Sequence, residues 1–426
     1  MDRTAFRNRP AFRNRKRGRI ISAVFAAIAL VLILPVSSFG QDDPPEKKVK
    51  IEGKRCPYCK TTGRLPNPFY ETHRHLEDEV LFCSYAIEKD KVGHGIPWIP
   101  CKRCKNEKLK AEAEEEFEKK VAILFNWLEK RREIDETLKV PKPLLHMRTE
   151  HFNWAWSIPK FKGADKRMYN AHTGLHLYAS RMEKFYRDWQ KVHKVTDKDN
   201  INNVHNIFCF ERQRIAMKAC PIYAHLASPN GKTSKQGTLS VYVTWWNKSK
   251  TPSDEDFHGA LVHNVNHLFT AVYKNHWWLH ECAIAYEGSS HWWEIYYFGR
   301  AIARCFVETD SGAGWRQYKW QSIVKKAVIA GKQPKMVDML TTPGTSLKGE
   351  HHPFAWSYID YMMSIDAHKV MDFFLVIKQK KHPREAFKKA FGMSIPGFQK
   401  AWEEWVIGTY NVQDESPAIP RRLRFR

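Results

Sequence analysis

Beyond the apolar stretch near its N-terminus, the sequence lacks any run that is long and apolar enough to cross a bilayer, and it contains no internal repeat. These absences argue against a polytopic membrane protein and against a repeat architecture. Acidic residues are also few, because 46 Asp and Glu stand against 70 Lys and Arg, which gives a formal net charge of +24. With 426 residues, 43% of them hydrophobic and 13% aromatic, the chain is not disordered and can bury a full core, in more than one domain.

The first 40 residues have the organisation of an export signal. A basic flank, Arg3 to Arg19, precedes an apolar stretch from Ile20 to Pro35, and Ser38-Phe39-Gly40 places small residues where a signal peptidase acts. The apolar stretch is short for a membrane span, which favours cleavage before Gln41 over retention as a signal anchor. In both cases we expect the body of the protein outside the cytoplasm, as a periplasmic, extracellular or membrane-anchored protein.

The positive charge bears on the choice of partner. Seven of the net positive charges lie in the first 40 residues, which leaves +17 for the rest of the chain. For an exported protein this charge favours an acidic envelope polymer, an anionic membrane surface or an acidic protein, and it disfavours nucleic acid. The charge alone does not choose among the favoured partners.

Composition divides the chain after the signal into successive segments. They are a polar linker (41–50), a cysteine-bearing module (51–106), a long charged helix (107–140), a main domain (144–410) and a basic tail (411–426). In the main domain, short aromatic or apolar runs typical of strands flank a segment whose apolar residues follow a helical face. This pattern predicts an α+β fold in which a small sheet packs against a mainly helical domain.

Two C-x-x-C pairs mark the cysteine module, Cys56 with Cys59 and Cys101 with Cys104. Such paired knuckles can direct four thiolates at one tetrahedral zinc ion, and they resemble a zinc ribbon, a kind of module used in interaction or folding. Disulfide bonds are the alternative, because exported proteins meet an oxidising environment. The gap between the knuckles includes Cys83 and predicts a short hairpin or helix inserted into the ribbon.

Four further cysteines have no metal-site spacing. They are Cys209, Cys220, Cys282 and Cys305, which we expect as buried small hydrophobic residues, with a disulfide as the alternative.

The segment LVHNVNHLF, 261–269, carries two histidines four residues apart. On a helix, His263 and His267 would stand one above the other and could hold one metal ion, although an exposed face would also accommodate such a pair. Ser253 and Asp256 have the spacing of a capping box and predict the start of this helix. Asn264 occupies the position of the glutamate in the H-E-x-x-H signature of zinc hydrolases, and an amide cannot take a proton from water.

A second segment, HWWLHECAIAYEG (276–288), begins a helix in which Glu281 could complete a His, His, Glu ligand set. Together the two segments resemble the gluzincin metallopeptidases, in particular the peptidase-MA-like group, whose second helix reads W-L-x-E-G-x-A-x-Y. The matching residues are Trp278, Leu279, Glu281 and Tyr286. Cys282 and Ile284 depart from the pattern. The similarity extends over roughly 144–410 and does not include the cysteine module.

The resemblance implies a zinc ion held by His263, His267 and Glu281, with no general base at Asn264. Since acid–base assistance contributes about 10² to 10⁴ in rate, we expect an impaired pseudopeptidase with a binding or structural role and a protein or peptide partner. The alternative is an active zinc peptidase whose base has moved elsewhere.

Several residues were weighed as a relocated base or as a group that stabilises the transition state. Asp256 is engaged at the helix start, and Glu287 is expected on a different side of the second helix from Glu281. Three histidines of the second segment are expected at the surface or behind the ligands, namely His276, His280 and His291. The candidates for transition-state stabilisation are Tyr358, Tyr361, His351 and His352.

Overall fold

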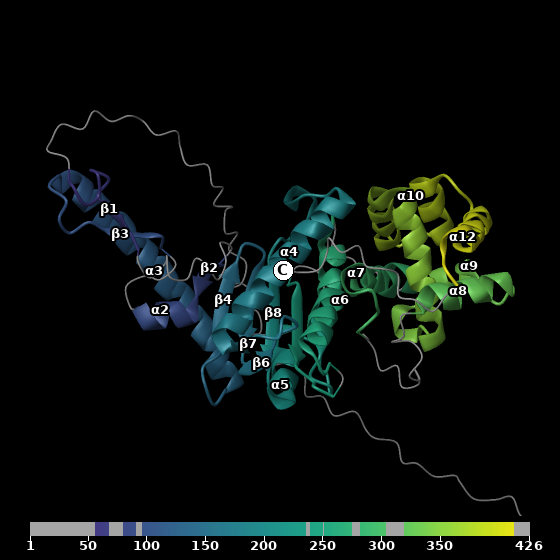
Figure 1. Ribbon diagram of the computed structural model, residues 1–426, viewed down its shortest axis with the longest axis horizontal. Helices are drawn as coiled ribbons and strands as arrows, with labels where there is room; N and C mark the ends of the chain where they lie inside the picture. Colours follow the sequence, from purple (N-terminus) through teal and green to yellow (C-terminus); the bar gives the residue numbers. More distant parts are fainter. Residues whose placement is uncertain are drawn as a thin grey trace, which may run out of the picture. The chain divides into compact units, whose positions relative to one another are not determined.

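The computed structural model of the chain describes residues 56–67, 80–90, 96–235, 239–249, 251–274, 282–303 and 319–412. Its central element is a mixed six-stranded sheet (Figure 1). The strand order is β2 (Val80–Cys83), β4 (Leu145–Thr149), β5 (Phe152–Trp156), β8 (His205–Phe210), β10 (Val241–Trp245) and β9 (Thr233–Lys235). Strands β5, β8 and β10 are parallel to one another, whereas β2, β4 and β9 are antiparallel to their neighbours.

Helices cover both faces of this sheet. Along β8 the side chains alternate, so Ile207 and Cys209 belong to one core and Phe208 and Phe210 to the other. The first core is shared with α4 (Ala171–His193) and α6 (Asp254–Val272). The second is shared with α3 (Glu107–Leu138) and α5 (Gln213–Tyr223). The α+β fold and the long charged helix predicted from the sequence are therefore confirmed.

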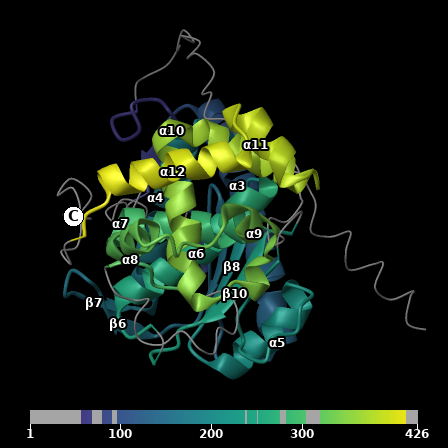
Figure 2. The ribbon, with the colours of Figure 1, turned by 90° about the vertical axis from the view of Figure 1, so that its right-hand side faces the viewer.

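From residue 284 to residue 409, the described elements are all helical. They are η3 (Ile284–Gly288), α7 (Ser289–Phe298), α8 (Trp320–Ile329), α9 (Met336–Thr341), η4 (Gly344–Ser346), η5 (Gly349–His351), α10 (His352–Lys378), α11 (Pro383–Phe391) and α12 (Ile395–Thr409). Helices α10, α11 and α12 lie together in both Figure 1 and Figure 2. Helix α10 packs on η3 and α7, and it carries His352 at its start.

The cysteine module contains a two-stranded ribbon, β1 (Arg64–Pro66) paired with β3 (Trp98–Pro100). The predicted insertion between the knuckles includes a strand and a short helix, β2 and α2 (Ser84–Asp90). Strand β2, however, pairs with β4 and forms an edge of the central sheet. The insertion therefore ties the ribbon to the main domain. A hairpin of β6 (Lys160–Lys162) and β7 (Met168–Asn170) and the short helix η2 (Asp197–Asp199) complete the described elements.

The predicted export signal (1–40) and linker (41–50) lie outside the described residues, as does the basic tail after residue 412. Among the helices that are described, none combines the length and the hydropathy that a membrane span requires.

A buried ion pair links the turn between β4 and β5 to α4. His151 Nδ1 lies 2.7 Å from Glu183 Oε2, and its Nε2 lies 3.5 Å from Asp197 Oδ2. Burial by itself lowers the pKa of His151, but its hydrogen bonds to Asp197 and Glu183 raise that pKa to about 9. The imidazole is therefore charged in the folded protein at neutral pH, whereas an unfolded histidine has a pKa of about 6.5.

We predict that this ion pair makes stability pH-dependent on the alkaline side. A folded pKa above the unfolded one gives a stabilisation that is complete below about pH 6.5 and disappears as pH rises through about 9. The effect is at most about 3 kcal/mol. Urea unfolding at pH 6 and pH 9.5 should show a larger loss of unfolding free energy in the parent than in His151→Gln. Equal losses in the two proteins would contradict the prediction.

Candidate metal centre

The predicted histidine pair lies on α6, and the start of this helix is as the sequence indicates. Ser253 Oγ accepts a hydrogen bond from the backbone N–H of Asp256 at 3.1 Å, and the Asp256 carboxylate accepts one from the backbone N–H of Ser253 at 3.3 Å. This capping box sets the phase of the helix, which stacks His263 and His267 one turn apart. The two side chains are 0% and 1% exposed, so the pair is not on a solvated face.

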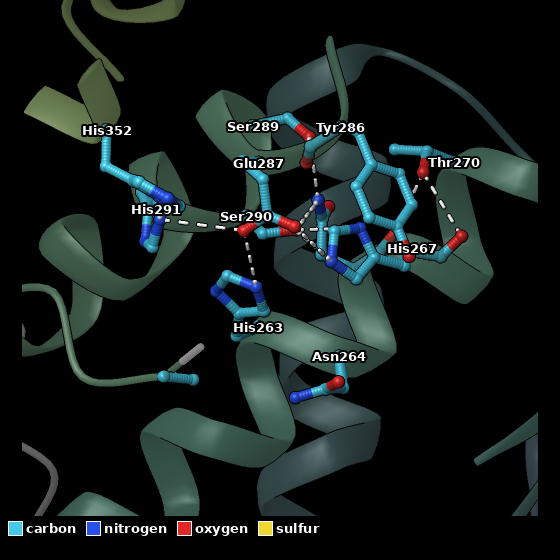
Figure 3. Close-up of polar contacts among 12 residues, drawn as sticks. His263, Asn264, His267, Thr270, Tyr286, Glu287, Ser289, Ser290, His291 and His352 are labelled. Atoms are coloured by element: carbon cyan, nitrogen blue, oxygen red, sulfur yellow. Dashed lines mark hydrogen bonds and ion pairs between the residues drawn. The ribbon is translucent and has the colours of Figure 1, made fainter. Parts of the chain in front are cut away.

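Both imidazoles face the carboxylate of Glu287 (Figure 3). His263 Nε2 lies 3.4 Å from Glu287 Oε2, and His267 Nε2 lies 3.9 Å from Glu287 Oε1. One ligand atom from each of the three residues can be chosen so that all lie within 4.8 Å of one another. The structure therefore contains a buried His, His, Glu group that could hold a metal ion.

Glu287 belongs to η3, a π-helical turn, and such turns are frequent at functional sites. The next residue, Gly288, packs against the backbone of α10: a Cβ atom added there would lie 2.4 Å from the carbonyl oxygen of Ala355. A glycine is therefore required for η3 to approach α10 this closely. The close approach seats Glu287 between α6 and α10.

The predicted third ligand, Glu281, lies outside the described residues, so this part of the prediction stays a prediction. Glu287 was expected on a different side of the second helix, and it is the carboxylate that the structure brings to the histidines. A π turn holds more residues than an α turn, so side-chain directions counted at 3.6 residues per turn are displaced beyond it. The signal in the sequence that could have indicated Glu287 is a carboxylate followed directly by a glycine.

The carboxylate of Glu287 is 0% exposed, and among the described residues neither of its oxygens accepts a hydrogen bond. Burial raises the pKa of a carboxyl group, yet the neighbouring His263 and His267 hold the pKa of Glu287 well below its usual range. A buried carboxylate is costly unless positive charge compensates it. This unsatisfied group fits a metal ion coordinated together with His263 and His267.

Glu294 of α7 orients the first histidine from behind. Its Oε2 lies 3.3 Å from His263 Nδ1 and 2.7 Å from His291 Nδ1, while its Oε1 accepts backbone hydrogen bonds from Ile302 at 3.2 Å and Ala303 at 2.5 Å. A carboxylate on the second nitrogen of a metal-binding histidine fixes the tautomer and strengthens the ligand. The sequence did not single out Glu294, whose i+3 spacing from His291 was the available signal.

His267 is held on its other side. Ser290 Oγ lies 3.2 Å from His267 Nδ1, and the Tyr286 ring stacks on the imidazole with a centroid separation of 3.7 Å (Figure 3). Burial lowers the pKa of His267 well below its ordinary value, which favours the neutral form that coordinates metals. Tyr286, one of the residues that carry the resemblance, therefore supports a candidate ligand.

Among the other histidines weighed, His291 and His352 extend the cluster, while His276 and His280 lie outside the described residues. His291 Nε2 lies 2.7 Å from His352 Nδ1 and 3.7 Å from Glu287 Oε2, and both rings are fully buried. His291 is thus buried and not at the surface, and together with Glu287 and His352 it belongs to a further group that could hold a metal ion.

The remaining candidates for transition-state stabilisation have other contacts. Tyr358 donates its hydroxyl to the carbonyl of Pro334 at 3.1 Å, and Tyr361 packs against Phe398 and Trp405. The Nε2 atom of His351 lies 3.9 Å from Glu350 Oε1, and its side chain is partly exposed. Of the four candidates, His352 is the one that belongs to the histidine and glutamate cluster.

The amide of Asn264 does not take part in this cluster. Its Nδ2 donates to the carbonyl oxygen of Ala260, one turn earlier, at 2.7 Å. In Figure 3 the side chain lies apart from Glu287 and its imidazole neighbours. The residue at the position of the usual general base is therefore bound to its own helix.

The four knuckle cysteines converge in the ribbon. Cys56, Cys59, Cys101 and Cys104 form one buried cluster. The sulfur atoms of the first three all lie within 4.8 Å of one another, close enough to bind one metal ion. No described cysteine is in a disulfide, so the disulfide alternative is not what the structure shows. Burial raises the pKa of Cys59, but the backbone N–H of Gly63 and the neighbouring thiols bring it to about 7. The cluster could hold a metal ion through thiolates.

The other predicted buried cysteines agree with expectation where they are described. Cys209 and Cys220 are 0% exposed and Cys282 is 2% exposed, while Cys305 lies outside the described residues.

Comparison with models of protein families gives no match for this chain. Comparison with curated proteins gives no match either. The geometry of the site therefore carries the functional argument.

We predict that Glu287, and not Glu281, completes the ligand set on α6. We call the group of His263, His267 and Glu287 the His263 centre. Glu287→Gln should lower the zinc affinity of this centre by at least about tenfold, because an amide is a far poorer ligand than a carboxylate. Glu281→Gln serves as the matched control and should retain the affinity. Competition with a chromogenic zinc chelator measures both variants. Loss of affinity in Glu281→Gln alone would assign the third ligand to that residue.

Proposed function

We propose that this chain is an exported, gluzincin-like zinc protein without effective peptidase activity, which acts through binding or through the structure that the ion maintains. The observation that carries the proposal is the convergence of His263, His267 and Glu287 beside an Asn264 amide that is bound to its own helix. The convergence of the three side chains supports a metal ion, and the Asn264 amide supports the loss of the ion's catalytic use.

Zinc suits this donor set. Two imidazole nitrogens and a carboxylate are among its common ligands, and three protein ligands leave a fourth position open. When bound in such a site, zinc supplies Lewis acidity. The protein's own part is to hold His263 through Glu294 and to hold His267 between Ser290 and Tyr286. We assign zinc to the four knuckle cysteines as well, as a structural ion.

The loss of catalysis follows from the duties of the nearby carboxylates. Glu287 is the proposed ligand, and Glu294 is shared between His263, His291 and two backbone amides. Neither is available to take a proton from water and return it to a leaving amine. Without that exchange, peptide hydrolysis loses about 10² to 10⁴ in rate.

Burial supports a structural or binding role for the ion. His263, His267 and Glu287 are each at most 1% exposed, so an ion held by them would be enclosed by protein. We propose that the partner is a protein or peptide and that an acidic envelope polymer or membrane surface adds attraction through the net charge of +17 on the chain after residue 40. The ribbon offers a contact surface, where Tyr58 is 55% exposed beside Arg103.

A second candidate function is an active zinc peptidase whose base is His352. It is favoured by the chain from Glu294 to His291 at 2.7 Å and from His291 to His352 at 2.7 Å. A carboxylate that holds a histidine in one tautomer is a known way to set a proton acceptor, and here the histidine so held, His291, contacts His352. This candidate differs from the first in predicting activity in the unmodified protein.

We predict that restoring a carboxylate at residue 264 creates activity that the parent lacks. Asn264→Glu should cleave casein or peptide libraries at least about 10²-fold faster than the parent. Asn264→Gln is the matched control, because it has the length of glutamate without its charge, and it should stay inactive. Robust hydrolysis by the parent that is abolished by both His263→Ala and His352→Gln would instead establish the second candidate.

We also predict that residues 1–40 direct export. A bacterial host that produces the full chain should carry it outside the cytoplasm, whereas a chain without residues 1–40 should stay with the cytoplasmic fraction. Cell fractionation followed by immunoblotting measures the distribution. Cytoplasmic retention of the full chain would remove the argument against nucleic-acid binding.

A further inference from the structure

A second group of metal-type ligands lies away from the His263 centre. Cys83 is the last residue of β2, and His172 and His176 lie one turn apart on α4. Cys83 Sγ is 3.4 Å from His172 Nε2, and His172 Nε2 is 3.0 Å from His176 Nε2. The three side chains belong to buried residues that are 3%, 8% and 5% exposed.

Ordinary hydrogen bonds account poorly for these contacts. A single ring nitrogen, His172 Nε2, faces both the sulfur of Cys83 and the Nε2 of His176. A neutral imidazole nitrogen has either one lone pair or one hydrogen, so it cannot form two well-aligned bonds at once. A metal ion between the three atoms would use one lone pair from each of them.

The spacings agree with tetrahedral zinc. Zinc–sulfur bonds of about 2.3 Å and zinc–nitrogen bonds of about 2.05 Å place sulfur and nitrogen ligands about 3.6 Å apart and two nitrogen ligands about 3.3 Å apart. The observed separations of 3.4 and 3.0 Å are within a few tenths of an ångström of these values. All three ligand atoms also lie within 4.8 Å of one another.

The fold holds each ligand in place. Pairing of β2 with β4 sets Cys83 opposite Met147, and both residues belong to the core on the α4 face of the sheet. A capping box between Asn170 and Thr173 fixes the start of α4, which places His172 in its first turn. Tyr85 stacks on the His172 ring with a centroid separation of 4.2 Å.

We propose that Cys83, His172 and His176 bind one zinc ion, with the fourth coordination position left for water or another ligand. The ion fastens the edge strand β2 to α4 and so secures the insertion of the cysteine module on the main domain. The site shares no residue with the His263 centre or with the four-cysteine knuckle, so it stands independently of both.

Zinc content tests the proposal. The full chain is reconstituted with zinc under reducing conditions and desalted, and its zinc is counted by mass spectrometry. Cys83→Ser and His176→Gln should each contain one zinc per chain fewer than the parent. His193→Gln, another buried histidine on the same helix, is the matched control and should keep the parental content. Parental zinc content in a folded Cys83→Ser protein would overturn the proposal.

The His263 centre is separated by its own variant. His263→Asn should lose a different equivalent, and the double variant with Cys83→Ser should lose two. If His263→Asn retains its zinc while Cys83→Ser loses one, the proposed function fails and this site stands.

A measurement on the parent chain covers the case in which the variants do not fold. Loaded with ¹¹³Cd, the parent should show a resonance between those of an all-thiolate site and a nitrogen and oxygen site, because the shift increases with the number of sulfur ligands. Absence of that intermediate resonance would also overturn the proposal.

Discussion

The charge of one buried carboxylate is the constraint on which this site depends. Glu287 is fully buried, and its pKa is held low by His263 and His267, so the group needs positive charge nearby. Burial meanwhile lowers the pKa of His267, which drives that imidazole toward its neutral form. The carboxylate requires a cation, and the histidine avoids becoming one. A metal ion bound here would reconcile the two tendencies, because it would supply the charge and accept the neutral ring as a ligand.

Helix α6 is capped at both ends. Its start is closed by Ser253 and Asp256, and its end is closed from α10 by Lys378. Lys378 Nζ donates to the carbonyls of Thr270, Ala271 and Tyr273, at 2.9, 3.0 and 2.6 Å. Burial lowers the pKa of this lysine to about 7, although the three carbonyls at a helix C-terminus favour its charged form. The same helix α10 receives Gly288 against its backbone, so one element positions both halves of the site.

Local patterns predicted the parts of this protein that are decided locally. The capping box, the i,i+4 histidine pair and the C-x-x-C knuckles each involve residues within one or two turns, and the structure contains them all. Apart from the convergence of the two knuckles, residues brought together across long separations were not predicted. Strand β2 pairs with β4, which lies far along the chain from it. The hydrogen bond from the His146 backbone to Ser84, next to β2, spans 62 residues. The residues around Cys83 do not predict that it contacts α4, although His172 and His176 have the same four-residue spacing as the histidine pair on α6. Glu287 was misjudged for a different reason, since a π turn changes the direction in which a helical side chain points.

The three candidate ion sites share one property, which bears on why Asn264 is tolerated. Each one joins separate segments of the chain: the two knuckles, β2 with α4, and α6 with η3. An ion at such a junction closes a loop, and its binding free energy adds to the free energy of folding. For that purpose the ligands matter and the general base does not. An asparagine at residue 264, where gluzincins carry a glutamate, would then forgo a chemical step without removing the contribution of an ion to stability. Asn264 even gains a hydrogen bond to Ala260 within its own helix. On the function proposed above, a site with His263, His267 and their supporting carboxylates but without a base is the one expected if the ion serves structure.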